Sequence, residues 1–421
     1  MPVEPLVVPR DQHTLTRRDI DPDALKVLYR LKDAGFSAYL VGGGVRDLLL
    51  GRRPKDFDIG TDAHPYQVKK LFRNCWIIGR RFRLAHVVFG KKVVEVATFR
   101  RQVSDAEMAE AKAAAESAEA PLFDEHQHLI HRDNTFGTAE EDAFRRDFTI
   151  NALFYDIATF SIIDYVGGWE DLHAGVIKCI GDPTLRFRED PVRMQRAISF
   201  AARLEFDIDQ PILDAIACHR DEIAKAAPPR LMDEYYKILR TGCARRTFEA
   251  LKQVGLFEPL SPVLHEQAGA TLWASLDRLD AYRRRFAACP DALTNALLLG
   301  SLIVPLGFSQ AGWPAWLEGG DKPGLNLGLL PLARKDVERI HQLLMLQRRL
   351  REPGRSSPHS RRMLVQRAAF ADALTWLEIH SDSADLVTYW RAEVGQPGPD
   401  APPAATPGRR RRRRRRSPRP G

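Results

Sequence analysis

The chain has 421 residues, 44% of them hydrophobic and 28% charged, which is long enough for two or three globular domains and typical of a soluble globular protein. Its formal net charge is +8, but residues 396–421 hold nine arginines and one aspartate and account for all of it. Residues 1–395 are therefore formally neutral, so any polyanion site there must arise from local clustering. The five cysteines are widely spaced, which argues against a zinc site and against a disulfide framework.

Neither membrane insertion nor export is indicated by the hydrophobic segments. The N-terminal residues MPVEPLVVPRDQ contain no apolar run long enough for a signal peptide. Residues 292–317 lack charged side chains, but Pro305 and Pro314 interrupt them, which favours a buried helix followed by a loop over a membrane span. We therefore expect a cytoplasmic protein.

The first part of the chain is expected to be mixed α/β. Asp21 can cap a helix over residues 21–34, with Pro22 in its first turn and Gly35 at its end. Further elements follow in order: a strand at 37–41, a glycine-rich turn at 42–44, a helix at 45–50, an extended segment at 56–59, a helix at 65–72, a hairpin of 87–89 with 93–99, and a strand pair of 152–157 with 162–166.

From about residue 189 the periodicity becomes helical. Helices are expected at 191–204, 231–239, 272–286, 335–351 and 360–379. The resulting division is a flexible N-terminus (1–20), a head (21–180) with an insertion at 104–120 that is either helical or mobile, a helical neck (181–260), a helical body (261–395) and a disordered basic tail (396–421).

The sharpest candidate site combines three glycines with two aspartates. Gly42–Gly44 would bring backbone N–H groups close to an anion at a helix start. In a strand, Asp56 and Asp58 would face the same side while Phe57 faces the core. Two converging carboxylates repel unless a cation lies between them, and their hard oxygens suit Mg²⁺. An isolated D-x-D is usually a pair of solvated loop acids, but a glycine turn 12 residues upstream favours a metal site.

A third acid would complete such a site. Glu95 stands alone in the apolar strand 93–99, where an unpaired buried carboxylate is costly. It is therefore either a metal-site residue or an edge-strand charge that discourages aggregation.

Two later segments are rich in polar groups. Arg145–Ala152 places Arg146, Asp147 and Asn151 at the mouth of a strand. Glu189–Arg196 opens a helix on which Glu189, Arg193 and Arg196 form one stripe. Such a stripe is either a salt-bridged solvent face or a surface that hydrogen-bonds a base edge.

In order and spacing, the segments Gly42–Asp58, Arg145–Ala152 and Glu189–Arg196 resemble the class II nucleotidyltransferase family, which contains bacterial poly(A) polymerases and CCA-adding enzymes. The match covers about residues 15–260 and implies an α+β fold, with a DNA-polymerase-β-like head and all-helical neck, body and tail regions.

The resemblance also implies roles for individual residues. Asp56 and Asp58 would bind two Mg²⁺ ions, with either Glu95 or Asp147 as a third catalytic acid. The ATP substrate would be bound by nine further residues: Gly43, Gly44, Arg46, Arg146, Asn151, Glu189, Asp190, Arg193 and Arg196. Gln195 stands where the family suggests an aliphatic residue.

Within the family, residues 77–87 resemble the segment that separates poly(A) polymerases from CCA-adding enzymes, and they contain Arg80, Arg81 and Arg83. The expected activity is template-independent polyadenylation of RNA 3′ ends, promoting RNA decay, with sequence-tolerant RNA contacts made by the Arg409–Arg416 tail. CCA addition to tRNA and non-catalytic RNA binding are the alternatives. Protein partners cannot be inferred.

Overall fold

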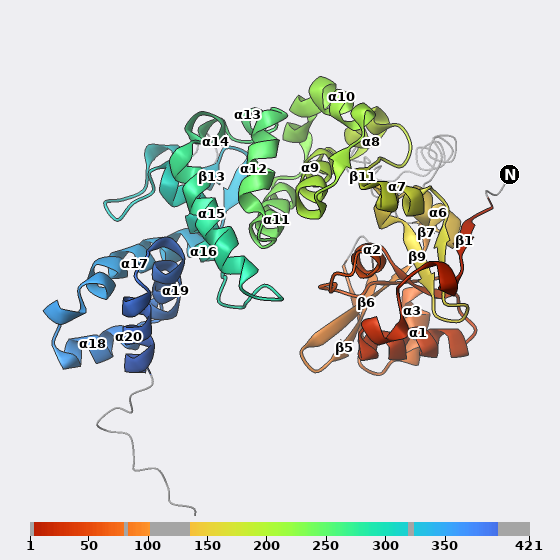
Figure 1. Ribbon diagram of the computed structural model, residues 1–421, viewed down its shortest axis with the longest axis horizontal. Helices are drawn as coiled ribbons and strands as arrows, with labels where there is room; N and C mark the ends of the chain where they lie inside the picture. The colour runs from red at the N-terminus through yellow and green to blue at the C-terminus, as the bar shows by residue number, and fades with distance from the viewer. Residues whose placement is uncertain (1–3, 80–82, 102–134, 319–323, 395–421) are drawn as a thin grey trace, which may run out of the picture.

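The computed structural model describes residues 4–79, 83–101, 135–318 and 324–394 (Figure 1). The predicted insertion at 104–120, the tail at 396–421, Arg80 and Arg81 lie outside these residues. Figure 1 shows a sheet-containing part at one end and an arc of helices leading away from it. In the described part of the chain, every helix is too short or too polar to cross a membrane.

The N-terminal part is built on a mixed sheet. Its order is β1–β10–β9–β2–β3–β6–β5–β4, and neighbouring strands are antiparallel except for the parallel pair β3 and β6. The strands are β1 (Leu6–Val8), β2 (Ala38–Val41), β3 (Ile59–Thr61), β4 (Cys75–Ile78), β5 (Leu84–Phe89), β6 (Lys92–Thr98), β9 (Leu153–Asp156) and β10 (Ser161–Asp164).

The two faces of this sheet are covered differently. Alternate residues such as Leu40 and Val96 face the main core, where helices α1 (Pro22–Asp33) and α3 (Pro65–Leu71) pack. On the opposite face, Val41 and Phe154 of the central strands join a smaller core with Ala143 of α6 (Ala139–Phe144). This smaller core does not extend over the outer strands β4–β6 as the structure describes them. The face of these strands that carries Trp76 is exposed. The central strands are thus buried on both faces and the outer strands on one.

Most of the expected elements are confirmed. Asp21 caps α1 by accepting a hydrogen bond from the Asp23 amide at 2.9 Å, and the hairpin around Gly90 is β5–β6, longer than predicted. The sequence patterns missed the short strands β1 and β4. The segment 1–20, expected to be flexible, contains β1, whose residues pair with β10 at the edge of the sheet.

Beyond the sheet the chain is almost wholly helical, as expected. The helices are α7 (Gly168–Ala174), α8 (Pro183–Glu189), α9 (Val192–Leu204), α10 (Gln210–His219), α11 (Pro228–Leu239), α12 (Ala244–Gln253), α13 (Phe257–Leu260), α14 (Pro262–Gln267), α15 (Ala270–Arg284), α16 (Asn295–Ile303), α17 (Arg334–Arg351), α18 (Pro358–Val365), α19 (Phe370–His380) and α20 (Ala384–Val394). The uncharged stretch forms α16, whose residues from Ala296 to Ile303 are all buried.

Three details differ from the expectations. The helix predicted at 360–379 is two helices, α18 and α19, and the turn between them lets both Leu364 and Phe370 reach the core. Two short strand pairs also occur among the helices: β11 (Val176–Ile177) with β12 (Asp207–Ile208), and β13 (Leu325–Leu327) with β14 (Leu330–Leu332).

The third difference concerns the segment Glu189–Arg196. Glu189 ends α8, so it does not lie on the same helix as Arg193 and Arg196 of α9. Asp190 between them is extended, with φ −147° and ψ 92°. The physical reason is Pro191, because a proline disfavours the helical region for the residue before it.

Candidate active site

The two aspartates lie in the loop that leads into β3. They were expected within a strand, but β3 begins at Ile59, one residue after Asp58. The Asp58 carbonyl nevertheless accepts a hydrogen bond from the Val41 amide at 3.0 Å, so the loop is already aligned with β2. Phe57 packs against the main core as expected. The Asp56 side chain is 65% exposed, 3.5 Å from the Lys55 Nζ.

Glu95 lies beside Asp58. Ile59 pairs with Val96 in the parallel ladder, which places the preceding residues of the two strands next to each other. Burial raises the pKa of Asp58 to about 6, and the negative charges of Glu95 and Asp56 raise it in the same direction. The Glu95 carboxylate is also 3.3 Å from the His86 Nε2. The negative charges of Asp56, Asp58 and Glu95 therefore repel each other where the loop enters β3.

The chemistry of these carboxylates fits a divalent cation. Hard oxygen ligands suit Mg²⁺, and a cation would relieve the repulsion that raises the Asp58 pKa. In the parts of the chain that the structure describes, no three Asp, Glu, His or Cys side chains are grouped tightly enough to hold an ion by themselves. Mg²⁺ commonly takes only one or two protein carboxylates and completes its shell with water and phosphate oxygens. A pair of carboxylates such as Asp56 and Asp58 would suit this pattern.

The glycine turn Gly42–Gly44 lies between the loop that carries Asp56 and the segment that carries Arg146. Gly42 has φ +70° and leads from β2 into α2 (Gly43–Leu49). A Cβ at Gly42 would lie 3.0 Å from the Arg146 Nη1, and one at Gly44 would lie 3.4 Å from the Asp56 carbonyl oxygen. The positive φ and the close approach of Arg146 together require glycine at residue 42.

Arg46 on α2 points into the protein. Its side chain is 2% exposed, and its Nε and Nη2 donate to the Asp47 Oδ1 at 2.9 and 2.7 Å. Its Nη1 donates to the Asn151 Oδ1. Asp47 is itself paired with Arg203 of α9 at 2.6 Å. Arg46 therefore orients Asn151 and connects the sheet to the helical part.

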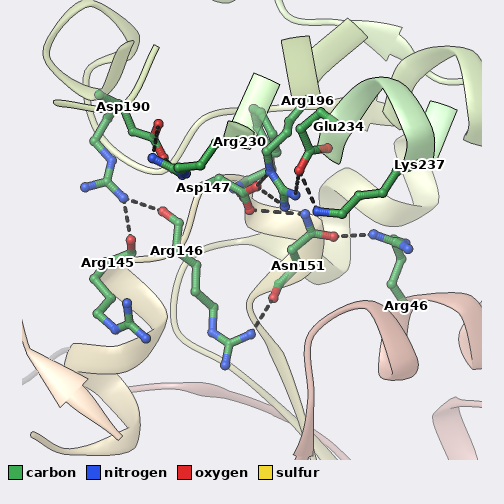
Figure 2. A network of polar contacts seen from close by, with 12 residues as sticks. Arg46, Arg145, Arg146, Asp147, Asn151, Asp190, Arg196, Arg230, Glu234 and Lys237 are labelled. Atoms are coloured by element: carbon green, nitrogen blue, oxygen red, sulfur yellow. Dashed lines mark hydrogen bonds and ion pairs between the residues drawn. The ribbon is translucent and has the colours of Figure 1, made fainter. Parts of the chain in front are cut away.

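Both carboxylate oxygens of Asp147 accept hydrogen bonds (Figure 2). Its Oδ2 accepts hydrogen bonds from the Arg196 Nε and Nη2 at 2.9 and 2.7 Å. Its Oδ1 accepts from the Phe148 amide at 2.8 Å and from the Asn151 Nδ2 at 3.1 Å. Burial alone would raise the Asp147 pKa, but the charge and hydrogen bonds of Arg196 outweigh it and hold the pKa at about 2. Asp147 is thus a fixed anion that positions Arg196.

A cavity of about 350 Å³ opens beside this pair. Asp190 and Arg230 form a double hydrogen bond at its edge, at 3.1 and 2.7 Å. Glu234 accepts from Lys237 at 2.6 Å and from Arg196 at 3.4 Å (Figure 2). The lining residues are Arg145, Asp147, Asp190, Val192, Arg193, Arg196, Arg230, Asp233, Glu234 and Lys237. Donors and acceptors in fixed positions suit the edge of a planar, polar ligand.

Comparison with known families agrees with this geometry. Residues 38–178, which contain the sheet acids, the glycine turn and Asp147, match the poly A polymerase head domain. Residues 205–267 match a second family, described as the probable RNA and SrmB-binding site of polymerase A.

Individual relatives of this head domain fall into two groups. The chain is 50% identical over 258 residues to poly(A) polymerase I of Salmonella typhimurium, across 61% of this chain and 54% of that protein. It is 35% identical over 240 residues to the CCA-adding enzyme of Lactobacillus helveticus, across 57% of this chain and 55% of that protein. The chain thus spans about half the length of the curated relatives it matches.

Solved structures extend the likeness beyond the head domain. The crystal structure of the Bacillus stearothermophilus CCA-adding enzyme in complex with CTP matches with a TM-score of 0.62 and 25% identity, covering 89% of this chain and 82% of that one. The predicted α+β fold, with a nucleotidyltransferase head followed by helical regions, is therefore confirmed.

The structure brings most of the candidate residues together in two groups. Asp56, Asp58 and Glu95 form one group on the head-domain sheet, and Asp147, Asp190, Arg193 and Arg196 lie at the cavity. Arg146 connects the groups: its charge lowers the Asp58 pKa, and its Nη1 donates to the Asn151 carbonyl at 3.1 Å. Arg83, in the segment that resembles poly(A) polymerases, is exposed.

The sequence patterns missed several polar residues of the site. Arg230, Glu234 and Lys237 follow one another at helical spacing on α11, so their charged stripe was a usable signal. Asp142, 3% exposed, accepts hydrogen bonds from both Arg145 and Arg146. Nothing in its sequence position distinguishes it from an ordinary helix acid, because its role depends on how α6 packs.

Proposed function

We propose that the protein transfers AMP from ATP to the 3′-hydroxyl of RNA without a template and releases pyrophosphate. The observation that carries the proposal is that carboxylates suited to Mg²⁺ and a polar cavity are connected by the glycine turn and Arg146. Identity to poly(A) polymerases I near 50%, against 35% for a CCA-adding enzyme, supports ATP and poly(A) as substrate and product.

In this proposal each group has a separate task. Asp56 and Asp58 would hold two Mg²⁺ ions, which activate the attacking hydroxyl and neutralise charge on the triphosphate. Glu95 is the better candidate for a third catalytic acid than Asp147, because it lies beside Asp58 and raises the Asp58 pKa. Both oxygens of Asp147 are already occupied by Arg196, Asn151 and the Phe148 amide.

The cavity would bind the incoming nucleotide. Asp190 and Arg230 offer an acceptor and a donor side by side, and Arg230 is 54% exposed and free to change partners. Arg193 is held by Glu189 at 3.2 Å, and Arg196 is held by Asp147, so both cations are preorganised. Gly43 and Gly44 would approach the triphosphate through their backbone, with Arg146 beside them. Arg46 would act by orienting Asn151.

Single-nucleotide incorporation tests the proposal. One RNA oligonucleotide is incubated with the protein, Mg²⁺ and one of the four nucleoside triphosphates at a time. Long adenylate tracts formed from ATP, with little use of the other three, are the expected result. Addition of one or two cytidylates from CTP would favour CCA addition instead, the function named for the Bacillus stearothermophilus structure.

The setting of the reaction follows from its substrates. We propose that the protein acts in the cytoplasm, where RNA and ATP are available together. We also infer that tailing promotes RNA decay, because it supplies a single-stranded 3′ end, which is the form of RNA that proteins bind most readily.

A further inference from the structure

The open face of the outer strands β4–β6 carries large apolar side chains. Trp76 is 63% exposed, Ile78 48% and Val93 49%. Their neighbours on the other face, such as Cys75 and Val94, are buried in the main core. Exposed apolar side chains gathered on one face are a usual mark of a binding surface.

This open face is continuous with the candidate catalytic acids. In the strand register, Trp76 is directly opposite His86, and His86 is directly opposite Glu95. Residues opposite each other in antiparallel strands share a face, and the His86 Nε2 lies 3.3 Å from the Glu95 Oε2. Because Glu95 lies beside Asp58, the four residues form one row across the sheet, from an exposed indole ring to a candidate metal ligand.

The length of this row suits a short stretch of nucleic acid. Neighbouring strands are about 4.8 Å apart, so the Trp76 backbone lies about 10 Å from that of Glu95 and about 14 Å from that of Asp58. Each nucleotide advances a strand by about 3.4 Å in a helical stack and by more when the strand is extended. If the RNA 3′-hydroxyl lies beside Glu95 and Asp58, one of the last few bases of the RNA therefore lies over Trp76.

The chemistry of the row favours bases over phosphates and over another protein. Glu95 is an anion and would repel a phosphate, whereas the indole ring stacks on the flat face of any base. A protein partner would place charged groups at the rim of its interface, because interface cores are depleted of charge. Here His86 lies within the apolar face, between Trp76 and Glu95.

We propose that Trp76 stacks on one of the last few bases of the RNA primer and that the row from Trp76 to Glu95 guides the RNA 3′ end to Asp58. The proposal rests on the proposed function, since it requires the 3′-hydroxyl to bind at the acids. Stacking on an indole is tolerant of sequence, which suits an enzyme that extends many RNA ends.

The test compares Trp76→Ala, Trp76→Phe and Tyr66→Ala in the full chain. Tyr66 is a matched control, because it is 60% exposed on α3, which packs on the opposite face of the sheet. Binding is measured without ATP, from the fluorescence of an oligoadenylate that carries 2-aminopurine at one of its last four positions. Steady-state rates are then measured against RNA and against ATP.

For Trp76→Ala we expect the RNA Kd and the KM for RNA to rise about 5- to 160-fold, the effect of losing one base stack. The 2-aminopurine quenching at one position should disappear, and an abasic nucleotide there should weaken wild-type binding but not the variant. The KM for ATP and the kcat reached at saturating RNA should stay within twofold. Trp76→Phe should retain most of the binding, and Tyr66→Ala should match the wild type.

Unchanged RNA affinity and KM in Trp76→Ala would overturn the proposal while leaving the proposed function intact. Equal effects of Trp76→Ala and Tyr66→Ala would also overturn it. A change in oligomeric state with Trp76→Ala, at constant RNA affinity, would assign the face to a second copy of the chain and likewise overturn it. If the wild type incorporates no nucleotide, the proposed function falls, and the ATP-free binding experiment alone decides about Trp76.

Discussion

At the scale of single residues, the firmest contact of the candidate site is the ion pair of Asp147 and Arg196. The Asp147 side chain is 12% exposed and lies 2.7 Å from the Arg196 Nη2. The Asp147 pKa is about 2, below the ordinary value of 3.8. A carboxyl group with a lowered pKa stabilises the fold fully above pH 3.8, and this contribution is lost as the pH falls towards 2.

We predict that Asp147→Asn lowers the free energy of unfolding by about 2 to 4 kcal/mol at pH 7, because it leaves a largely buried arginine with a weakened partner. The loss should shrink as the pH falls from about 4 to about 2, because the unfolded chain binds a proton at Asp147 in this range before the folded protein does and the ion pair then contributes less to stability. Urea denaturation at pH 7, 4 and 3 measures both effects. Asp277→Asn is the control, since its ion pair with Arg245 is about half exposed and such pairs contribute little. A loss that does not depend on pH would contradict the assignment.

At the residue level, the sequence indicates candidate site residues where the chemistry is local, and their roles stay predictions. The pair Asp56 and Asp58, the glycine turn and the Arg145–Ala152 segment could all be located, because each is a short run of unusual residue types. Side-chain direction could not be predicted. Arg46 was expected to face the triphosphate, yet it is buried against Asp47 and Asn151, and that depends on how α2 packs against the rest of the head.

At the scale of elements, α9 carries polar residues towards the site and an apolar face into the core. Met194, Ile198 and Ala201 are buried. Gln195 beside them is 0% exposed, and both its Oε1 and its Nε2 lack hydrogen-bond partners. Burying an amide without hydrogen bonds is costly.

We therefore predict that Gln195→Leu raises the free energy of unfolding by about 1 to 3 kcal/mol, because it removes two unsatisfied polar atoms at similar volume. Thermal and urea denaturation measure the change. The control is Gln347→Leu on α17, which should destabilise the protein because the Gln347 Nε2 donates two hydrogen bonds, at 3.1 and 3.0 Å. A lower stability of Gln195→Leu would show that Gln195 has a partner, such as a buried water.

Element boundaries were harder to predict than the elements themselves. The break between α8 and α9 follows from Pro191, which the sequence shows, but the helix was still expected to include Glu189. The strands β1 and β4 were missed because each has only three or four residues, too few for an alternating pattern to stand out. Their pairing with distant strands, rather than their own sequence, makes them strands.

At the scale of the whole molecule, charge is distributed unevenly along the chain. The nine arginines of residues 396–421 carry the net charge of the protein, while the candidate site of the head consists of local clusters of charged residues. The fold class followed from the change of periodicity near residue 189 together with the family resemblance. The placement of α11 over the cavity could not be predicted from the sequence, because it depends on long-range packing.

Deleting residues 396–421 should weaken binding to long RNA and reduce the steepness with which affinity falls as salt rises, because fewer phosphates are neutralised. Incorporation on a short primer should persist, since the two groups of site residues remain. Filter binding from 50 to 300 mM salt measures the slope. A variant with the eight residues Arg409–Arg416 changed to serine separates charge from length. An unchanged salt slope would contradict the proposed role of the tail.

The central claim is that Asp58 belongs to the catalytic centre. The Asp58 pKa is raised from 3.8 to about 6. In metal-free protein the unfolded chain therefore releases the Asp58 proton at lower pH than the folded protein does, and the free energy of unfolding falls as the pH rises from about 4 to about 6. Above that range the ionised group opposes folding. Asp58→Asn removes the charge and should raise the metal-free free energy of unfolding at pH 8 by about 1 to 2 kcal/mol.

The most direct test is AMP incorporation by Asp58→Asn protein at saturating Mg²⁺, ATP and RNA, with the exposed Asp33→Asn as control. The rate should fall by more than about 100-fold, since even outer-shell partners of metal sites are worth 10- to 100-fold, while the fold is at least as stable as that of the wild type. Incorporation within a few-fold of the wild-type rate, in a stably folded Asp58→Asn variant, would contradict the account.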